Sequence, residues 1–239
     1  MNTASVPPAS VLPASVLISG ASGQLGASVL ARLLADGCSV LAPVSSAASA
    51  TALTRERVKA AQVDLTDESS VREYVGSLAN DRELRAAVLL AGGFAMGGLR
   101  ETDGAALRKM IATNFETAFH LVRELLPVFE RRGGGQFVLI GARPAISPAD
   151  GQHMAAYALS KGLVMQLAEL VNAAGRDKNI DATVIVPSVI DTKTNRDAMP
   201  DADPKRWVSP QAIADTIAFV LSDSGRQMRG SVLKLYNES

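Results

Sequence analysis

The chain has 239 residues and carries 24 Lys plus Arg against 24 Asp plus Glu, so its formal net charge is zero. This balance excludes the overall basic field that attracts nucleic acids or anionic membranes, and it favours a small-molecule partner. Cys38 is the only cysteine, and the sequence shows neither a secretory signal nor an apolar run long enough to span a membrane. We therefore expect a cytoplasmic protein with no nucleic acid, no membrane and no metal among its partners.

Residues 1–15 are rich in Ala, Ser and Pro and show no periodicity, which predicts a disordered tail. Residues 16–239 have a size typical of a single α/β domain built around one large sheet.

The first motif of this domain is a short apolar strand, Val16–Ser19, followed by three glycines and a helix. Such a turn lets backbone N–H groups at a helix N-terminus approach a pyrophosphate, where the helix dipole also favours negative charge. A plain strand-to-helix turn is the alternative. The candidate cofactor residues here are Gly20, Ser22, Gly23, Gln24, Leu25 and Gly26.

A second strand, 38–44, ends where dinucleotide-binding folds normally present a carboxylate to the adenosine ribose. This chain has Val44 and Ser45 instead, which leaves room for a 2′-phosphate and favours NADP slightly over NAD. Arg55 or Arg57 could approach that phosphate, or both could be solvated charges.

The third and fourth predicted strands, 58–63 and 86–90, also end in candidate cofactor residues. Asp64, followed by Leu65, could accept a hydrogen bond from an adenine amino group, or it could fix the following turn. The fourth strand leads directly into Ala91, Gly92 and Gly93, where the backbone lies open at the edge used by ligands of α/β sheets.

A helix is predicted over residues 104–131, and Asn114 stands inside its apolar stripe. A buried amide without partners costs about 1–3 kcal/mol, so we expect this side chain to be hydrogen-bonded. A fifth strand, 136–141, and a loop, 142–153, follow.

Tyr157 and Lys161 are four residues apart and share one face of the next predicted helix. A neighbouring ammonium can lower the pKa of a phenol and make it a usable proton donor. The alternative is an amphipathic helix with a snorkelling lysine.

A sixth strand, 180–187, precedes a polar segment, 188–207, that we interpret as a substrate lid. A helix starting after Ser209 and a last strand, 231–236, complete the pattern. Strands alternating with helices predict a Rossmann-type, doubly wound parallel sheet of about seven strands.

In this order the motifs resemble the short-chain dehydrogenase/reductase family over nearly the whole chain after the tail. The resemblance implies an NAD(P)-dependent oxidoreductase that transfers a hydride to a carbonyl or quinonoid substrate. It implies that Tyr157 donates the proton, that Lys161 lowers its pKa and holds the nicotinamide ribose, and that Asn114 supports a water leading to the lysine. It also implies a loop over the nicotinamide that contains Pro187, Val189, Ile190 and Thr192.

The chain departs from the family at the end of the fifth strand. Ala142 replaces the serine that usually hydrogen-bonds the substrate carbonyl, and Ser147 on the following loop is a candidate replacement. Together with the glycine spacing, this departure resembles dihydropteridine reductase-like members of the family. A non-catalytic NAD(P)-binding regulator is the alternative function. The helices over 104–131 and 154–171 carry more apolar positions than one buried face uses, which predicts a homodimer or homotetramer.

Overall fold

The computed structural model describes residues 12–239, in which seven strands form one sheet. The strands are β1 (Ser15–Ser19), β2 (Ser39–Val44), β3 (Val58–Gln62), β4 (Leu84–Leu89), β5 (Gly135–Ile140), β6 (Ile180–Pro187) and β7 (Val232–Leu235). Their order is β3-β2-β1-β4-β5-β6-β7, and every neighbouring pair is parallel. The chain therefore changes direction across the sheet between β1 and β4, which is where ligands of open α/β sheets bind.

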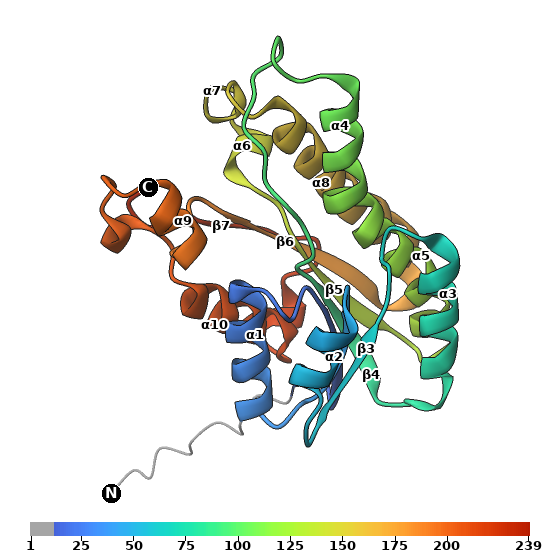
Figure 1. The fold of residues 1–239 in the computed structure, drawn as a ribbon. Helices are drawn as coiled ribbons and strands as arrows, with labels where there is room; N and C mark the ends of the chain where they lie inside the picture. Colours follow the sequence, from blue (N-terminus) through green and yellow to red (C-terminus); the bar gives the residue numbers. More distant parts are fainter. Residues whose placement is uncertain (1–11) are drawn as a thin grey trace, which may run out of the picture.

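Helices cover both faces of this sheet (Figure 1). One layer contains α1 (Gln24–Ala35) and α10 (Pro210–Leu221), with α2 (Ala47–Leu53) beside them; the other contains α3 (Glu68–Ser77), α4 (Gly104–Ile111), α5 (Thr117–Arg131) and α8 (Ala155–Gly175). This arrangement confirms the predicted single-domain, doubly wound architecture.

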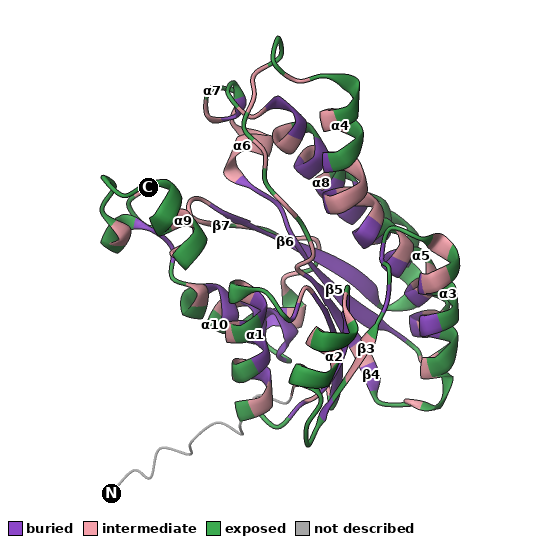
Figure 2. Cartoon of the chain, viewed as in Figure 1, coloured by how far each residue is buried: buried purple, intermediate pink, exposed green. Residues whose placement is uncertain are grey.

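The inner strands β2, β1, β4, β5 and β6 are almost completely buried because helices cover both faces of the sheet, whereas the edge strands β3 and β7 are partly exposed (Figure 2). Within β1, Leu17 packs under α3, α5 and α8, whereas Val16 and Ile18 pack under α1 and α10. All three side chains are fully buried. Two apolar cores therefore hold the sheet in place and leave its carboxyl edge free for a site.

Three predicted segments differ in detail from the observed structure. The helix expected over 104–131 is divided into α4 and α5 by a π-helical turn, η2 (Ala112–Glu116). The loop 142–153 contains two short helices, α6 (Arg143–Ile146) and α7 (Pro148–Gly151), and the lid contains α9 (Lys193–Ala198) and the 3-10 turn η4 (Pro204–Arg206). These helices are held by local hydrogen bonds. They are too short to show a helical repeat of apolar residues in the sequence.

The N-terminal boundary also differs from the prediction. Ser15, placed in the tail, is buried in β1 and donates a hydrogen bond from its hydroxyl to Asp81 Oδ2 at 2.9 Å. Leu12 packs against the core beside α1. The rest of the predicted tail, residues 1–11, lies outside the described residues. Between residues 12 and 239, no helix is both long and apolar enough to cross a membrane.

Candidate active site

The glycine turn between β1 and α1 packs closely against α1 and against the residues that follow β4. Gly20 has φ +72°, and a Cβ there would lie 2.9 Å from the backbone nitrogen of Ala91. A Cβ on Gly26 would overlap the carbonyl oxygen of Gly20. Gly23 stands at the N-cap of α1, where no side chain caps the first turn. The glycines let this turn pack closely on its neighbours, and with the uncapped N–H groups at the start of α1 they form a cradle whose donors suit a pyrophosphate.

Asn114 connects the fourth strand to the helix that carries Tyr157. Its Oδ1 accepts a hydrogen bond from the Gly93 backbone N–H at 2.8 Å, and its Nδ2 donates to Ser160 Oγ at 3.0 Å. The residue is buried, with 1% of its surface exposed. Its amide is therefore hydrogen-bonded as expected, and it lies in the π-helical turn η2, which displaces the helix locally.

Lys161 reaches the same edge of the sheet from α8. Its Nζ donates to the carbonyl oxygen of Ile140 at 2.8 Å, at the end of β5. A Cβ added to Gly92 would lie 2.6 Å from Asn114 Oδ1 and 3.4 Å from Lys161 Nζ. The bare backbone of Gly92 therefore leaves room for both polar groups, which meet above β4 and β5.

Tyr157 stands one turn before Lys161 on α8 and is half-buried. The ring of Phe94 meets it edge to face, with centroids 5.0 Å apart and an interplanar angle of 70°. This contact comes from the loop after β4 and was not among the residues that the sequence predicted. The only indication of this contact in the sequence was that an aromatic residue, Phe94, directly follows Gly92 and Gly93.

The electrostatics of this pair differ from the expectation. Burial raises the pKa of Tyr157 to about 12 and lowers the pKa of Lys161 to about 8. Burial therefore acts against the predicted lowering of the phenol pKa by Lys161, because surroundings poor in water disfavour the charged form of both groups. Tyr157 is thus a neutral phenol at pH 7, which is the protonated form that a proton donor requires.

Ala142, at the position of the missing serine, is 3% exposed and precedes α6. Ser147 lies between α6 and α7, and its hydroxyl, together with the guanidinium of Arg143, holds the pKa of Asp150 below its usual value. Arg143 donates to Asp150 Oδ2 at 2.8 Å and to the Ser239 carbonyl at 2.7 Å. The Ser147 hydroxyl therefore lies close enough to Asp150 to affect its charge, within the loop that follows Ala142.

The residues predicted to bind the adenosine lie at the carboxyl ends of β2 and β3. Ser45 is exposed, and Asp64 Oδ1 accepts hydrogen bonds from the Thr66 backbone N–H at 2.9 Å and hydroxyl at 2.6 Å. The turn-fixing role of Asp64 is thus present, and its carboxylate remains exposed toward solvent. The Leu65 carbonyl is hydrogen-bonded to His120 Nδ1 at 3.0 Å, which fixes the following residue of the same turn.

The suggestion that Arg55 or Arg57 approaches a 2′-phosphate is wrong. Both precede β3, so they lie at the amino edge of the sheet, opposite to Ser45. Arg57 donates to the carbonyl oxygen of Leu34, at the end of α1, at 3.0 Å.

The predicted loop over the nicotinamide starts at Pro187, the last residue of β6, and forms the first part of the predicted lid. The Val208 N–H donates to the Val189 carbonyl at 2.9 Å, and the carbonyl of Ile190 accepts from Asn195 Nδ2 at 2.8 Å. Thr192 caps α9. These contacts bring the two ends of the lid together and fix α9 on its first part.

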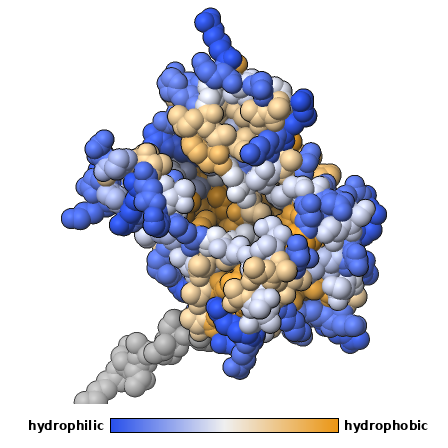
Figure 3. Space-filling view, in the orientation of Figure 1, coloured by the Kyte–Doolittle hydropathy of each residue, from blue (hydrophilic) through white to orange (hydrophobic). Residues whose placement is uncertain are grey.

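The lid also touches the glycine turn, because the Lys193 N–H donates to Gln24 Oε1 at 2.7 Å. Figure 3 shows an apolar hollow in the middle of this face, above α1 and between α9 and the α6–α7 segment. The floor of the hollow is therefore suited to a flat, partly apolar ring.

Chemically, the described residues offer a buried amine, a neutral phenol and a bare glycine backbone along one edge. Residues 12–239 contain no cluster of three His, Cys, Asp or Glu side chains that could hold a metal ion. The glycine cradle and the free backbone at Gly92 fit an extended dinucleotide lying across the switch point between β1 and β4.

Comparison with known proteins agrees with this geometry. Residues 14–203 match the family model described as short chain dehydrogenase. The chain is 24% identical over 235 residues to the uncharacterised oxidoreductase YmfI of Bacillus subtilis, covering 92% of this chain and 96% of the relative. It is 25% identical over 229 residues to the 3-oxoacyl-[acyl-carrier-protein] reductase MabA of Mycobacterium tuberculosis, covering 92% and 90%. The solved structure of ElxO with NADP bound has a TM-score of 0.86 at 21% identity, covering 94% and 97%.

The sheet order and the glycine cradle define a Rossmann-type dinucleotide-binding fold. The chain belongs to the short-chain dehydrogenase/reductase family and is an NAD(P)-dependent oxidoreductase of that family. The comparisons support the family as a whole and do not single out the dihydropteridine reductase-like branch.

Proposed function

We propose that this enzyme reduces a carbonyl or quinonoid substrate, with Tyr157 as the proton donor. The observation that carries the proposal is the hydrogen-bonded connection from Gly93 through Asn114 to Ser160, which lies between Tyr157 and Lys161 on α8. It fixes the helix that carries the phenol and the amine against the carboxyl edge of the sheet. When bound, the nicotinamide supplies the hydride.

The side chains of the protein carry out the other parts of the reaction, which are proton donation, charge stabilisation and positioning. The neutral Tyr157 phenol gives its proton to the substrate atom that gains negative charge. Lys161, when protonated, provides a positive charge that stabilises the resulting phenolate, and its N–H groups can hold a ribose hydroxyl. Asn114 is a positioning residue, because both ends of its amide are used to hold other groups. The face shown in Figure 3 has an apolar hollow, and apolar walls disfavour water beside a bound ring.

A quinonoid dihydropterin is our leading candidate substrate. Ala142 follows β5 at the position where the family usually has a serine, so no hydroxyl is offered there to a substrate oxygen. A quinonoid ring accepts hydride readily and needs only protonation at nitrogen, so it requires little stabilisation of a substrate oxygen. A relative that reduces a 3-oxoacyl group, MabA, makes carbonyl compounds the second class to test.

Turnover of quinonoid dihydropterin against a panel of ketones and 3-oxoacyl thioesters tests this proposal. Ser147→Ala is expected to retain activity on the best substrate. A large loss with this variant would mean that Ser147 replaces the missing serine, and no pterin turnover would contradict the substrate assignment.

We propose that NADPH binds at least as well as NADH. Val44 and Ser45, at the end of β2, place no carboxylate against a 2′-phosphate, and the structural neighbour ElxO was solved with NADP bound. Val44→Asp should turn the preference toward NADH. Titration of the unmodified enzyme decides the point, because a tenfold preference for NADH, about 1.4 kcal/mol, would contradict it.

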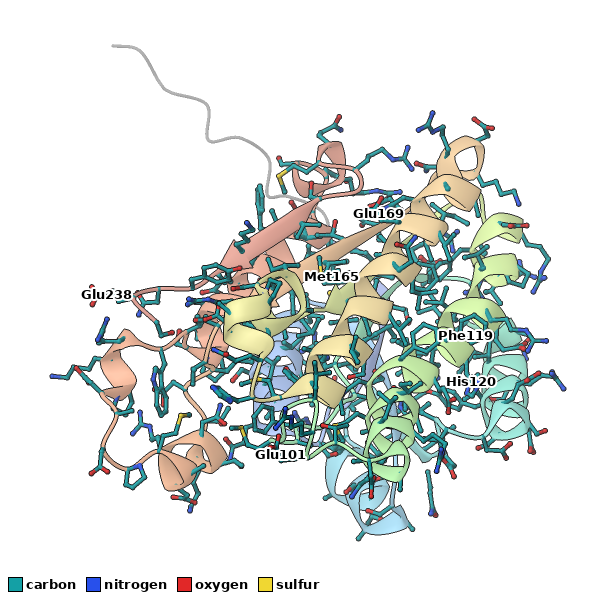
Figure 4. The ribbon with its side chains drawn as sticks, turned by 90° about the horizontal axis from the view of Figure 1, so that it is seen from above. Glu101, Phe119, His120, Met165, Glu169 and Glu238 are labelled. Atoms are coloured by element: carbon teal, nitrogen blue, oxygen red, sulfur yellow. The ribbon has the colours of Figure 1, made fainter. Side chains whose placement is uncertain are left out.

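We propose that the protein forms a homodimer or homotetramer through α5 and α8, which run side by side (Figures 1 and 4). Their outer faces expose large apolar side chains: Phe119 at 38%, Leu159 at 55%, Leu163 at 38% and Leu170 at 60%. Figure 4 labels Phe119 on α5, with Met165 and Glu169 on α8. A second copy would remove this apolar area from water.

Light scattering tests this assembly at micromolar concentration. Leu170→Glu should give a monomer, whereas Phe219→Glu on α10, also an exposed apolar position, should not. A monomeric unmodified protein would contradict the proposal.

A further inference from the structure

Two segments flank the apolar hollow: the 142–153 segment, which contains α6 and α7, and the lid, 188–207, which contains α9 (Figure 3). Within the described residues, no hydrogen bond or ion pair joins these two segments directly. Residues 236–239, which end at the point marked C in Figure 1, contact both of them. The width of the hollow therefore depends on how residues 236–239 are held on each side.

Several hydrogen bonds fix residues 236–239 to the lid. Ser188 donates its hydroxyl to the Tyr236 carbonyl oxygen at 2.7 Å. Asn237 Nδ2 donates to the carbonyl oxygens of Lys205 and Trp207, at 3.0 Å in both cases. These bonds reach both the first and the last part of the lid, so the lid and the last residues form one unit.

Arg143 provides the connection on the other side of the hollow. Its Nη1 donates to the Ser239 carbonyl oxygen at 2.7 Å, which in the described part of the chain is the only hydrogen bond between 142–153 and 236–239. The guanidinium carbon also lies 5.2 Å from the centre of the Tyr236 ring. A single side chain therefore joins the two sides of the hollow through residues 236–239.

The same guanidinium group holds α6 and α7 together. Its Nε and Nη2 donate to the two carboxylate oxygens of Asp150, at 2.8 and 3.3 Å. Arg143 is the first residue of α6, and Asp150 lies in α7. A planar guanidinium group serves the carboxylate and the Ser239 carbonyl at once because its donors point in different directions.

We propose that Arg143 is a positioning residue, which sets the gap between the 142–153 segment and the lid and so controls the affinity for the substrate. Arg143 directly follows Ala142 at the end of β5, and the 142–153 segment leads into the helix that carries Tyr157. Its guanidinium group is occupied by Asp150, Ser239 and Tyr236, so it acts through this segment and not on the reacting atoms. The inference rests on the proposed function for the place where the substrate binds.

Arg143→Gln removes the charge and the fork of donors. The side chain is 34% exposed, so the variant is expected to fold. Without the connection, the 142–153 segment must be ordered when the substrate binds, which lowers affinity. On the best substrate from the panel above, we expect KM to rise about tenfold, with a much smaller change in kcat. NADPH affinity should stay the same, because the glycine cradle lies outside this connection.

Hydrogen exchange measured by mass spectrometry tests the connection without any substrate. In Arg143→Gln, the amides of 142–153 should exchange faster than in the unmodified protein, whereas those of the lid should change little because the lid keeps its own bonds. This readout stands even if no reductase substrate is found, so failure of the proposed function is distinguished from failure of this inference.

Lys178→Gln is the matched control. It removes another half-exposed ion pair, which joins Lys178 to Glu130 on α5 at 2.6 Å, at the other edge of the sheet. It should leave both KM and the exchange of 142–153 unchanged. Unchanged exchange of this segment in Arg143→Gln, or an unchanged KM for the substrate, would overturn the proposal.

Discussion

Asn114 Oδ1 accepts a hydrogen bond from the Gly93 backbone N–H at 2.8 Å, which joins a π-helical turn to the loop after β4. The bond bridges residues 21 positions apart in sequence. It places the backbone of the Gly92–Gly93 turn and the base of α8 in one fixed arrangement, because the same amide also donates to Ser160.

Asn114→Ala removes this connection. It leaves the Gly93 N–H and the Ser160 hydroxyl without their partner, so we expect a loss of about 1–3 kcal/mol in the free energy of unfolding, measured by urea titration. We also expect a lower kcat. Asn172→Ala is the matched control, since Asn172 bridges the backbone of Ala182 through bonds of 3.0 and 2.7 Å far from Tyr157. A similar stability loss without a change in kcat is expected for the control; equal kcat in both variants would contradict the positioning role.

Gly26→Ala places a Cβ against the carbonyl of Gly20, so the first turn of α1 must shift away from the glycine turn. We expect weaker binding of NADPH and a lower melting temperature, by fluorescence titration and differential scanning fluorimetry. Gly76→Ala on α3 has no atom within 4 Å of the new Cβ and should be neutral or stabilising by up to about 1 kcal/mol. Unchanged cofactor affinity in Gly26→Ala would contradict the cradle.

The burial of Lys161 predicts that the stability of the cofactor-free protein depends on pH. Its pKa is lowered by burial from 10.5 to about 8, so the unfolded chain binds more protons than the folded one between these values. Stability should therefore rise with pH across that window. Lys161→Met removes the buried charge, and at pH 7 it should be more stable than the unmodified protein by roughly 2–3 kcal/mol.

The advantage of Lys161→Met should shrink as the pH rises from about 8 to 10.5. Thermal unfolding of both proteins over this range checks the sign. If the stability advantage of Lys161→Met grew with pH, the pKa of Lys161 would not be lowered by burial.

The sequence was sufficient for the sheet, because buried parallel strands are continuous apolar runs and glycine turns separate them from helices. It also identified Asn114 as a polar residue that needs partners. It could not name those partners, because Gly93 and Ser160 come from distant parts of the chain and meet only in the folded structure.

Two expectations changed for physical reasons. Arg55 and Arg57 were left open between a contact with a 2′-phosphate and solvated charges, and the structure excludes the first alternative, because a residue that precedes a strand lies at the opposite edge from one that follows the neighbouring parallel strand. The pKa of Tyr157 was expected to fall because of Lys161, but spacing along a helix carries no information about burial, which dominates here. The sequence was therefore a better guide to Tyr157 as a candidate proton donor than to the pKa of its phenol.

The central claim is that Tyr157 gives the proton, and Tyr157→Phe tests it most directly. The substitution keeps the ring and its contact with Phe94 while removing the hydroxyl. The matched control is Tyr74→Phe on α3, which removes a buried hydroxyl without a hydrogen-bond partner in the described residues. The measurement is kcat on the best substrate, together with the NADPH dissociation constant. We expect Tyr157→Phe to lose roughly 10²–10⁴-fold in kcat with nearly unchanged NADPH affinity, and Tyr74→Phe to keep full activity. Full activity in Tyr157→Phe would contradict the account.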